Sequence, residues 1–144
     1  MSASSSDFWP GSVRCFDLTL PTPAENLALD EVLLSEVEAD PSRAVLRLWQ
    51  PDGEFVVVGR SNRVETEVHA DRCRPEGVGI FRRSSGGGAG VMRPGCLAFA
   101  LALPLTEALR SLGVATVTRH GMDRHGAGVS TAGPGVGVWR AARP

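Results

Sequence analysis

The chain has 144 residues, of which 42% are hydrophobic and 22% charged, and this composition fits one globular domain rather than a disordered or fibrous protein. The net charge of −1 provides no general attraction to nucleic acid or to an anionic membrane surface, so we expect neither as a partner. Three widely spaced cysteines exclude a disulfide scaffold and indicate a reducing, cytoplasmic compartment.

The N-terminal residues are rich in serine and lack the basic start and apolar core of a signal peptide, so we expect residues 1–12 to be a disordered leader. Alternating apolar side chains then predict a strand over residues 13–20. Thr22 and Glu25 form a capping-box pattern, and Pro23 between them suits the first helical position. A helix should therefore begin at Pro23, with an apolar face made of Leu29, Val32, Leu33 and Val37.

A β-hairpin is expected after this helix. Its strands would cover residues 45–49 and 55–58, and the turn-forming residues 51–53 would join them. Since consecutive strands with a short turn usually pair with each other, we expect both strands in one sheet.

A second capping-box pattern follows the hairpin. Asn62 and Glu65 have the required spacing, so we expect a helix over residues 64–74 that stops before Pro75. The apolar residues 78–81 then predict the next strand.

This strand leads into a glycine-rich run with the sequence Arg82-Arg83-Ser84-Ser85-Gly86-Gly87-Gly88-Ala89-Gly90-Val91. Glycines let a backbone adopt positive φ and approach a ligand closely, and inward-facing amides can form an anion site. Adjacent arginines suit phosphate or carboxylate. The run is not a P-loop, because the chain has no lysine, and it precedes a strand rather than the helix of a dinucleotide fingerprint. On residue types alone, a plain turn or bulge remains the alternative.

The strand predicted after the glycine run has two different apolar faces. Large residues share one face and small residues the other, so we expect burial on both sides; the large ones are Leu97, Phe99, Leu101 and Leu103, and the small ones Cys96, Ala98, Ala100 and Ala102. A helix should follow over residues 105–112 and stop at Gly113. Residues 119–144 are rich in glycine and arginine without a hydrophobic period, so we expect an irregular tail.

Three stretches together resemble the lipoate–protein ligase family of the biotin/lipoate ligases. Residues 82–89 resemble its signature loop RRxSGGGA, residues 26–31 its N-L-A-x-[DE]-E segment, and residues 48–60 its L-x-x-W…V-V-x-G-[RQ] segment. The resemblance implies an α/β (α+β) fold, a mixed or antiparallel sheet backed by helices, like the first half of the family's catalytic domain. Residues 13–118 would form this partial domain.

The resemblance also implies a reaction. ATP, with Mg²⁺, would activate lipoate or octanoate to an acyl-adenylate, and the acyl group would pass to a lysine of a lipoyl-acceptor domain in 2-oxoacid dehydrogenase or glycine cleavage proteins. The backbone of the loop would hold the phosphate or the acyl carbonyl oxygen; the implied binding residues are Arg60, Arg82, Arg83, Gly86, Gly87, Gly88, Ala89, Gly90 and Val91. The small face of residues 96–102, or Trp49, would be available for the aliphatic chain, although both also suit an ordinary core. No catalytic side chain and no metal ligand is predicted.

The chain departs from the family in two places: Gly90 stands where valine is usual in the loop, and a functional lysine downstream of the loop is missing. Family members carry a downstream lysine that contacts the acid and the phosphate, whereas all fifteen basic residues here are arginine. Arginine has a larger, planar head and does not replace a lysine point charge. We therefore expect a truncated or frame-shifted member, with two alternatives to an active ligase: an inactive remnant, or a binding subunit that needs a second chain to supply the lysine segment.

Overall fold

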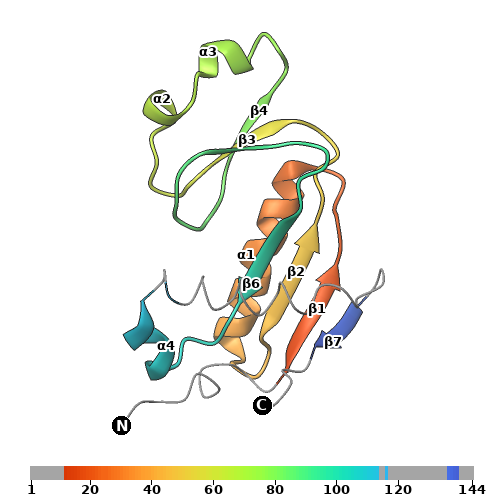
Figure 1. Cartoon of the computed structure of the whole chain (residues 1–144), viewed down its shortest axis with the longest axis vertical. Helices are drawn as coiled ribbons and strands as arrows, with labels where there is room; N and C mark the ends of the chain where they lie inside the picture. The colour runs from red at the N-terminus through yellow and green to blue at the C-terminus, as the bar shows by residue number, and fades with distance from the viewer. Residues whose placement is uncertain (1–11, 114–115, 117–135, 140–144) are drawn as a thin grey trace. The chain divides into compact units, whose positions relative to one another are not determined.

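The computed structural model of the chain describes residues 12–113, 116 and 136–139 (Figure 1). Its elements, in chain order, are β1 (Val13–Asp17), α1 (Pro23–Ala39), β2 (Val45–Trp49), β3 (Phe55–Val58), α2 (Val64–Glu67), α3 (Ala70–Cys73), β4 (Gly79–Arg82), β5 (Gly90–Met92), β6 (Ala98–Ala102), α4 (Glu107–Leu112) and β7 (Val136–Trp139). No helix among the described residues is long and apolar enough to cross a bilayer.

The chain folds into two compact units whose sequence ranges interleave. Unit 1 draws on residues 1–17, 33–47 and 100–144, and unit 2 consists of residues 18–32 and 48–99. A sheet with the strand order β6-β2-β1-β7 is separate from a smaller sheet with the order β4-β3-β5. β3 pairs in parallel with β4 and antiparallel with β5, so the fold is mixed α/β and the predicted fold class is confirmed.

The N-terminus of α1 has the predicted capping box. The Thr22 N–H donates to Glu25 Oε2 over 3.0 Å, and the Glu25 N–H donates to Thr22 Oγ1 over 3.2 Å. The apolar face differs from the prediction, because Val32 is 53% exposed while Leu33 and Val37 are buried. Apolar residues surround much of this helix, so the pattern did not fix which stripe would face inward.

The predicted pairing of residues 45–49 with residues 55–58 is wrong, although both strands exist. β3 pairs with β4 on one side and with β5 on the other, so neither edge of β3 is available to β2. β2 instead lies between β6 and β1 in the other sheet (Figure 1). A parallel pair needs a crossover, and residues 59–78 with α2 and α3 provide it.

The helix predicted over residues 64–74 is two short helices. Val68 between them has extended backbone angles, with φ −135° and ψ 134°. The residue before α2 is Arg63, which makes no side-chain capping bond, so the predicted Asn62 cap is also wrong. Asn62 belongs instead to a turn, in which its N–H donates to the Gly59 carbonyl over 3.1 Å.

Strand β6 is buried on one face rather than two. Its small face is the inner one: Ala102 is 7% exposed, and Ala98 packs against the core of unit 2. Leu97 and Phe99, on the face of large residues, are 55% and 45% exposed. The prediction of burial on both sides is therefore wrong for these two residues, which no described layer covers.

The core of unit 2 is an aromatic cluster on one face of the small sheet. Trp49 and Phe55 stack with ring centroids 6.4 Å apart, and Phe81 meets Phe55 edge-on at 5.6 Å. Val57 is buried in the same cluster, against which Leu27, Met92 and Ala98 pack. Of the candidates for lining an acyl slot, Trp49 is therefore buried in this core, and Ala98, from the small face of residues 96–102, packs against it.

The C-terminal residues contain one strand that was not expected. Val136–Trp139 forms β7, which pairs antiparallel with β1 in the register Val13 to Trp139. The prediction of an irregular tail is thus wrong for these four residues, where two valines and a tryptophan favour extended backbone. The rest of the tail, and residues 1–11 of the predicted leader, lie outside the described part of the chain.

Candidate functional site

The glycine loop, residues 83–89, lies where two parallel strands end. Val58 of β3 and Arg82 of β4 are register partners, so the segments that follow both strands leave the sheet at the same edge. The Arg83 N–H donates to the Val58 carbonyl over 3.0 Å, and the Arg60 N–H donates to the Ser85 carbonyl over 2.9 Å. The loop then returns through β5. Arg60 is therefore beside the loop.

Gly59 and Gly87 are the two positions at which this arrangement requires glycine. A Cβ on Gly59 would overlap the carbonyl oxygen of Gly87 and lie 2.8 Å from Asn62 Oδ1. Gly87 has φ +103°, and a Cβ there would lie 2.6 Å from Arg83 Nη2. A Cβ on Gly86 or Gly90 would meet nothing within 4 Å. The prediction of site residues missed Gly59, for which the signal was a single glycine directly after three valines.

Arg83 closes the glycine loop on itself. Its Nη2 donates to the carbonyls of Gly86 over 2.8 Å and Gly88 over 3.0 Å, and its Nε donates to Gly86 over 3.1 Å. A guanidinium carries five N–H donors in a planar fork, which suits several carbonyls at once. In the observed contacts, Arg83 fixes the shape of the loop.

Arg82 holds the neighbouring turn, residues 59–62. Its Nη1 donates to the carbonyls of Gly59, Arg60 and Asn62 over 2.8, 3.1 and 2.8 Å. Because Nη1 has two hydrogens and three acceptors, one N–H is shared. Arg82 thus binds the backbone of the turn behind the loop; the family resemblance implied it only as one of the binding residues.

Several donors around the loop have no protein acceptor in the described part of the chain. These are the amide N–H groups of residues 84–88 and the guanidinium of Arg60. The Ala89 N–H has a long bond, 3.4 Å, to Glu67 Oε2. Backbone N–H groups held in a loop next to a cation can stabilise negative charge, because the donors are fixed before the anion arrives.

Asn26 supports the start of α1 from the inside. Its Nδ2 donates to the carbonyls of Leu20 and Thr22, both over 2.8 Å, and its Oδ1 accepts from the Leu20 N–H over 2.9 Å. It is 3% exposed. A buried amide with these bonds orders the segment between β1 and α1, so this asparagine has a structural role in unit 2.

The described residues contain no group of three His, Cys, Asp or Glu side chains that could hold a metal ion. Cys15, Cys73 and Cys96 are all free thiols. Burial, and secondarily the negative charge of Asp17, raises the pKa of the Cys15 thiol above its usual range, which makes it a poor nucleophile.

Residues 22–127 match the family model of the lipoyl protein ligase A/B catalytic domain. The chain belongs to this family. A candidate lipoate-protein ligase A of Aeropyrum pernix is 45% identical over 69 residues, which cover 47% of this chain and 25% of that protein. The chain therefore spans about a quarter of this relative's length.

Solved structures of lipoate protein ligases have the same fold. Lipoate-protein ligase A bound with ATP is 29% identical, with a TM-score of 0.55 over 61% of this chain and 35% of that chain. A candidate lipoate protein ligase of T. acidophilum with bound lipoic acid is 30% identical, with a TM-score of 0.55 over 61% and 36%. The bipartite lipoate protein ligase of Thermoplasma acidophilum, studied with its E2 lipoyl domain, is 30% identical, with a TM-score of 0.54 over 61% and 34%.

Proposed function

We propose that this chain provides the nucleotide- and acyl-binding part of a lipoate–protein ligase. The reaction is ATP-dependent activation of lipoate, or octanoate, to an acyl-adenylate, followed by transfer to a lysine of an acceptor domain. The observation that carries the proposal is the glycine loop at the end of two parallel strands, with the amides of residues 84–88 directed to no described acceptor. The ATP and lipoic acid bound by its structural relatives support the same substrates here.

The residues have distinct roles in this proposal. The amides of residues 84–88 hold the nucleotide phosphate or the acyl carbonyl oxygen, where negative charge develops. Arg60, which has no ion-pair partner among the described residues, supplies the positive charge. Arg83 shapes the loop and Arg82 holds the turn behind it. Mg²⁺ enters with the ATP phosphates.

The acceptor is a lipoyl domain of a 2-oxoacid dehydrogenase or glycine cleavage protein. Support comes from the archaeal ligase that was studied with its E2 lipoyl domain. We place the reaction in the cytoplasm, in accord with the three free cysteines.

A second candidate function is binding without activation. The observation that favours it is the absence of lysine from the sequence, because the family's downstream lysine contacts both the acid and the phosphate. In this case the chain binds ATP and lipoate, and another polypeptide supplies the lysine.

One experiment separates the candidates. The purified 144-residue chain is titrated with ATP and with lipoate by calorimetry, and lipoate-dependent exchange of pyrophosphate into ATP is measured on the same sample. Binding together with exchange supports the ligase, and binding without exchange supports the binding subunit. If neither ATP nor lipoate binds to the folded chain, both candidates are wrong and the inactive remnant remains.

A further inference from the structure

A pocket of about 360 Å³ lies on the face of the small sheet opposite the aromatic core. Val56 of β3 and Val91 of β5 are register partners and line its floor. Side chains one residue along a strand point to the opposite face of the sheet. The neighbours of these two valines in the same strands accordingly pack in the aromatic core: Phe55, Val57 and Met92. The segment of α2 and α3 provides the opposite wall, with Val68 and Cys73. This volume is within the range of small-ligand sites, which are also mostly apolar.

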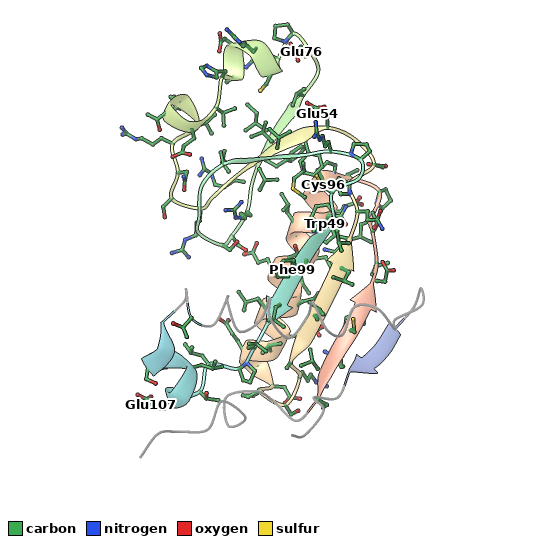
Figure 2. The ribbon with its side chains drawn as sticks, in the orientation of Figure 1. Trp49, Glu54, Glu76, Cys96, Phe99 and Glu107 are labelled. Carbon is green, nitrogen blue, oxygen red and sulfur yellow. The ribbon has the colours of Figure 1, made fainter. Side chains whose placement is uncertain are left out.

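The rim of this pocket is acidic. Its ionisable lining residues are three glutamates, one arginine and one histidine: Glu54, Glu67, Glu76, Arg72 and His69. Figure 2 shows Glu54 just before β3 and Glu76 in the connection between α3 and β4. Neither of these two carboxylates has a hydrogen bond or ion pair within the described ranges. Carboxylates without an ion-pair partner, beside an apolar floor, favour the binding of a cation and disfavour the binding of a carboxylate.

The pocket is also connected to the glycine loop. Ala89 and Gly90 form part of its wall, and Glu67 Oε2 accepts the Ala89 N–H over 3.4 Å. Because this hydrogen bond is long and therefore weak, Glu67 Oε2 can accept from another donor with little loss of free energy. A cation in the pocket would interact with the carboxylate of Glu67, which is the group that accepts the Ala89 N–H of the loop.

We propose that this pocket binds an aliphatic ammonium group, with its alkyl stem on the valines and its charge among Glu54, Glu67 and Glu76. Lysine side chains commonly combine these two features, because their methylene stems pack on apolar surface while the ammonium stays at a polar rim. A free alkylamine and a protein lysine share this chemistry. The site adjoins the glycine loop through Ala89 and Gly90, but residues 84–88, whose amides are proposed to hold the anion, are not part of its lining.

The test is a titration of the ¹⁵N-labelled 144-residue chain, followed by NMR. n-Hexylamine is compared with n-hexanol and hexanoate, which have the same stem with no charge or the opposite charge. We expect saturable shifts at Val56, Val68 and Ala89, and an affinity for hexylamine about fivefold above that for hexanol, as exposed ion pairs provide. Equal binding of hexanol, or tighter binding of hexanoate, would overturn the proposal.

Variants locate the charge that is responsible. The Glu54→Gln, Glu76→Gln double variant should remove the preference for hexylamine over hexanol, while Glu65→Gln, on α2 but outside the pocket lining, should retain it. An equal loss in both variants contradicts the assignment. A comparison of Nα-acetyl-lysine methylamide with its norleucine analogue distinguishes the two sources of the ammonium group. Tighter binding of the lysine compound than of the norleucine compound indicates a protein lysine. Binding of hexylamine without binding of the lysine compound indicates a small amine.

Discussion

The α-carbon of Gly59 lies against the carbonyl oxygen of Gly87, so closely that a Cβ on residue 59 would overlap that oxygen. This contact packs the turn after β3 against the glycine loop after β4. Arg82 reinforces it by binding three carbonyls of the turn, and Arg83 reinforces it by binding two carbonyls of the loop. The loop is thus shaped by backbone contacts before any substrate arrives.

Gly59→Ala should therefore destabilise the chain and displace the loop. We expect a loss of about 1–3 kcal/mol in the free energy of unfolding, the usual cost of overpacking, together with weaker ATP binding. Urea denaturation and calorimetry measure the two effects. Gly53→Ala is the matched control, because a Cβ there meets nothing within 4 Å. If both variants unfold at the same urea concentration as the unaltered chain, the close contact does not exist.

Local sequence signals predicted the elements well where the stabilising partners lie within a few residues. The capping box of Thr22 and Glu25 spans three residues, and its hydrogen bonds are present.

Features that depend on distant partners were predicted less well. β2 and β3 have the spacing of a hairpin, yet β3 pairs with β4 and β5. The residues of the two strands do not indicate which of several possible strands each will pair with. Likewise, the carbonyls that Arg82 binds are 20 to 23 residues away, so the local sequence did not indicate them. For β6, the pattern identified two apolar faces without indicating that Phe99 would be exposed.

Arg82→Gln should destabilise the turn after β3, because three carbonyls lose a charged donor. We expect a loss of about 1 kcal/mol in the free energy of unfolding, since the contacts are largely exposed. Arg82→Lys should recover part of this loss, because an ammonium also carries three N–H donors. Thermal unfolding measures both. Arg93→Gln serves as the control, because the Arg93 side chain is exposed and makes no hydrogen bond or ion pair within the described part of the chain, while its carbonyl still accepts the Cys96 N–H. An equal decrease in the melting temperature of this variant would contradict the assignment.

Cys15 should react slowly with alkylating reagents. Burial and the charge of Asp17 both favour the neutral thiol and raise its pKa, so the reactive thiolate is scarcer at a given pH than in an ordinary cysteine. In a Cys73→Ser, Cys96→Ser background, the rate of alkylation by iodoacetamide against pH should rise at higher pH than in the urea-unfolded chain. Adding Asp17→Asn should move the profile to lower pH, and an unchanged profile would rule out the electrostatic contribution of Asp17.

Arg60→Ala should weaken ATP binding without changing stability. Its backbone N–H holds the loop through Ser85, but its guanidinium has no recorded partner among the described residues, so its removal breaks no native contact. We expect the dissociation constant for ATP to rise roughly tenfold, as for the loss of one charge-assisted hydrogen bond, and its salt dependence to decrease. Arg63→Ala is the control, since Arg63 is an exposed arginine three residues away whose side chain makes no capping bond. Calorimetry at low and high salt compares the two variants. If ATP binding were weakened equally in both variants, any positive charge near the turn would have the same effect, and Arg60 would not contact the phosphate.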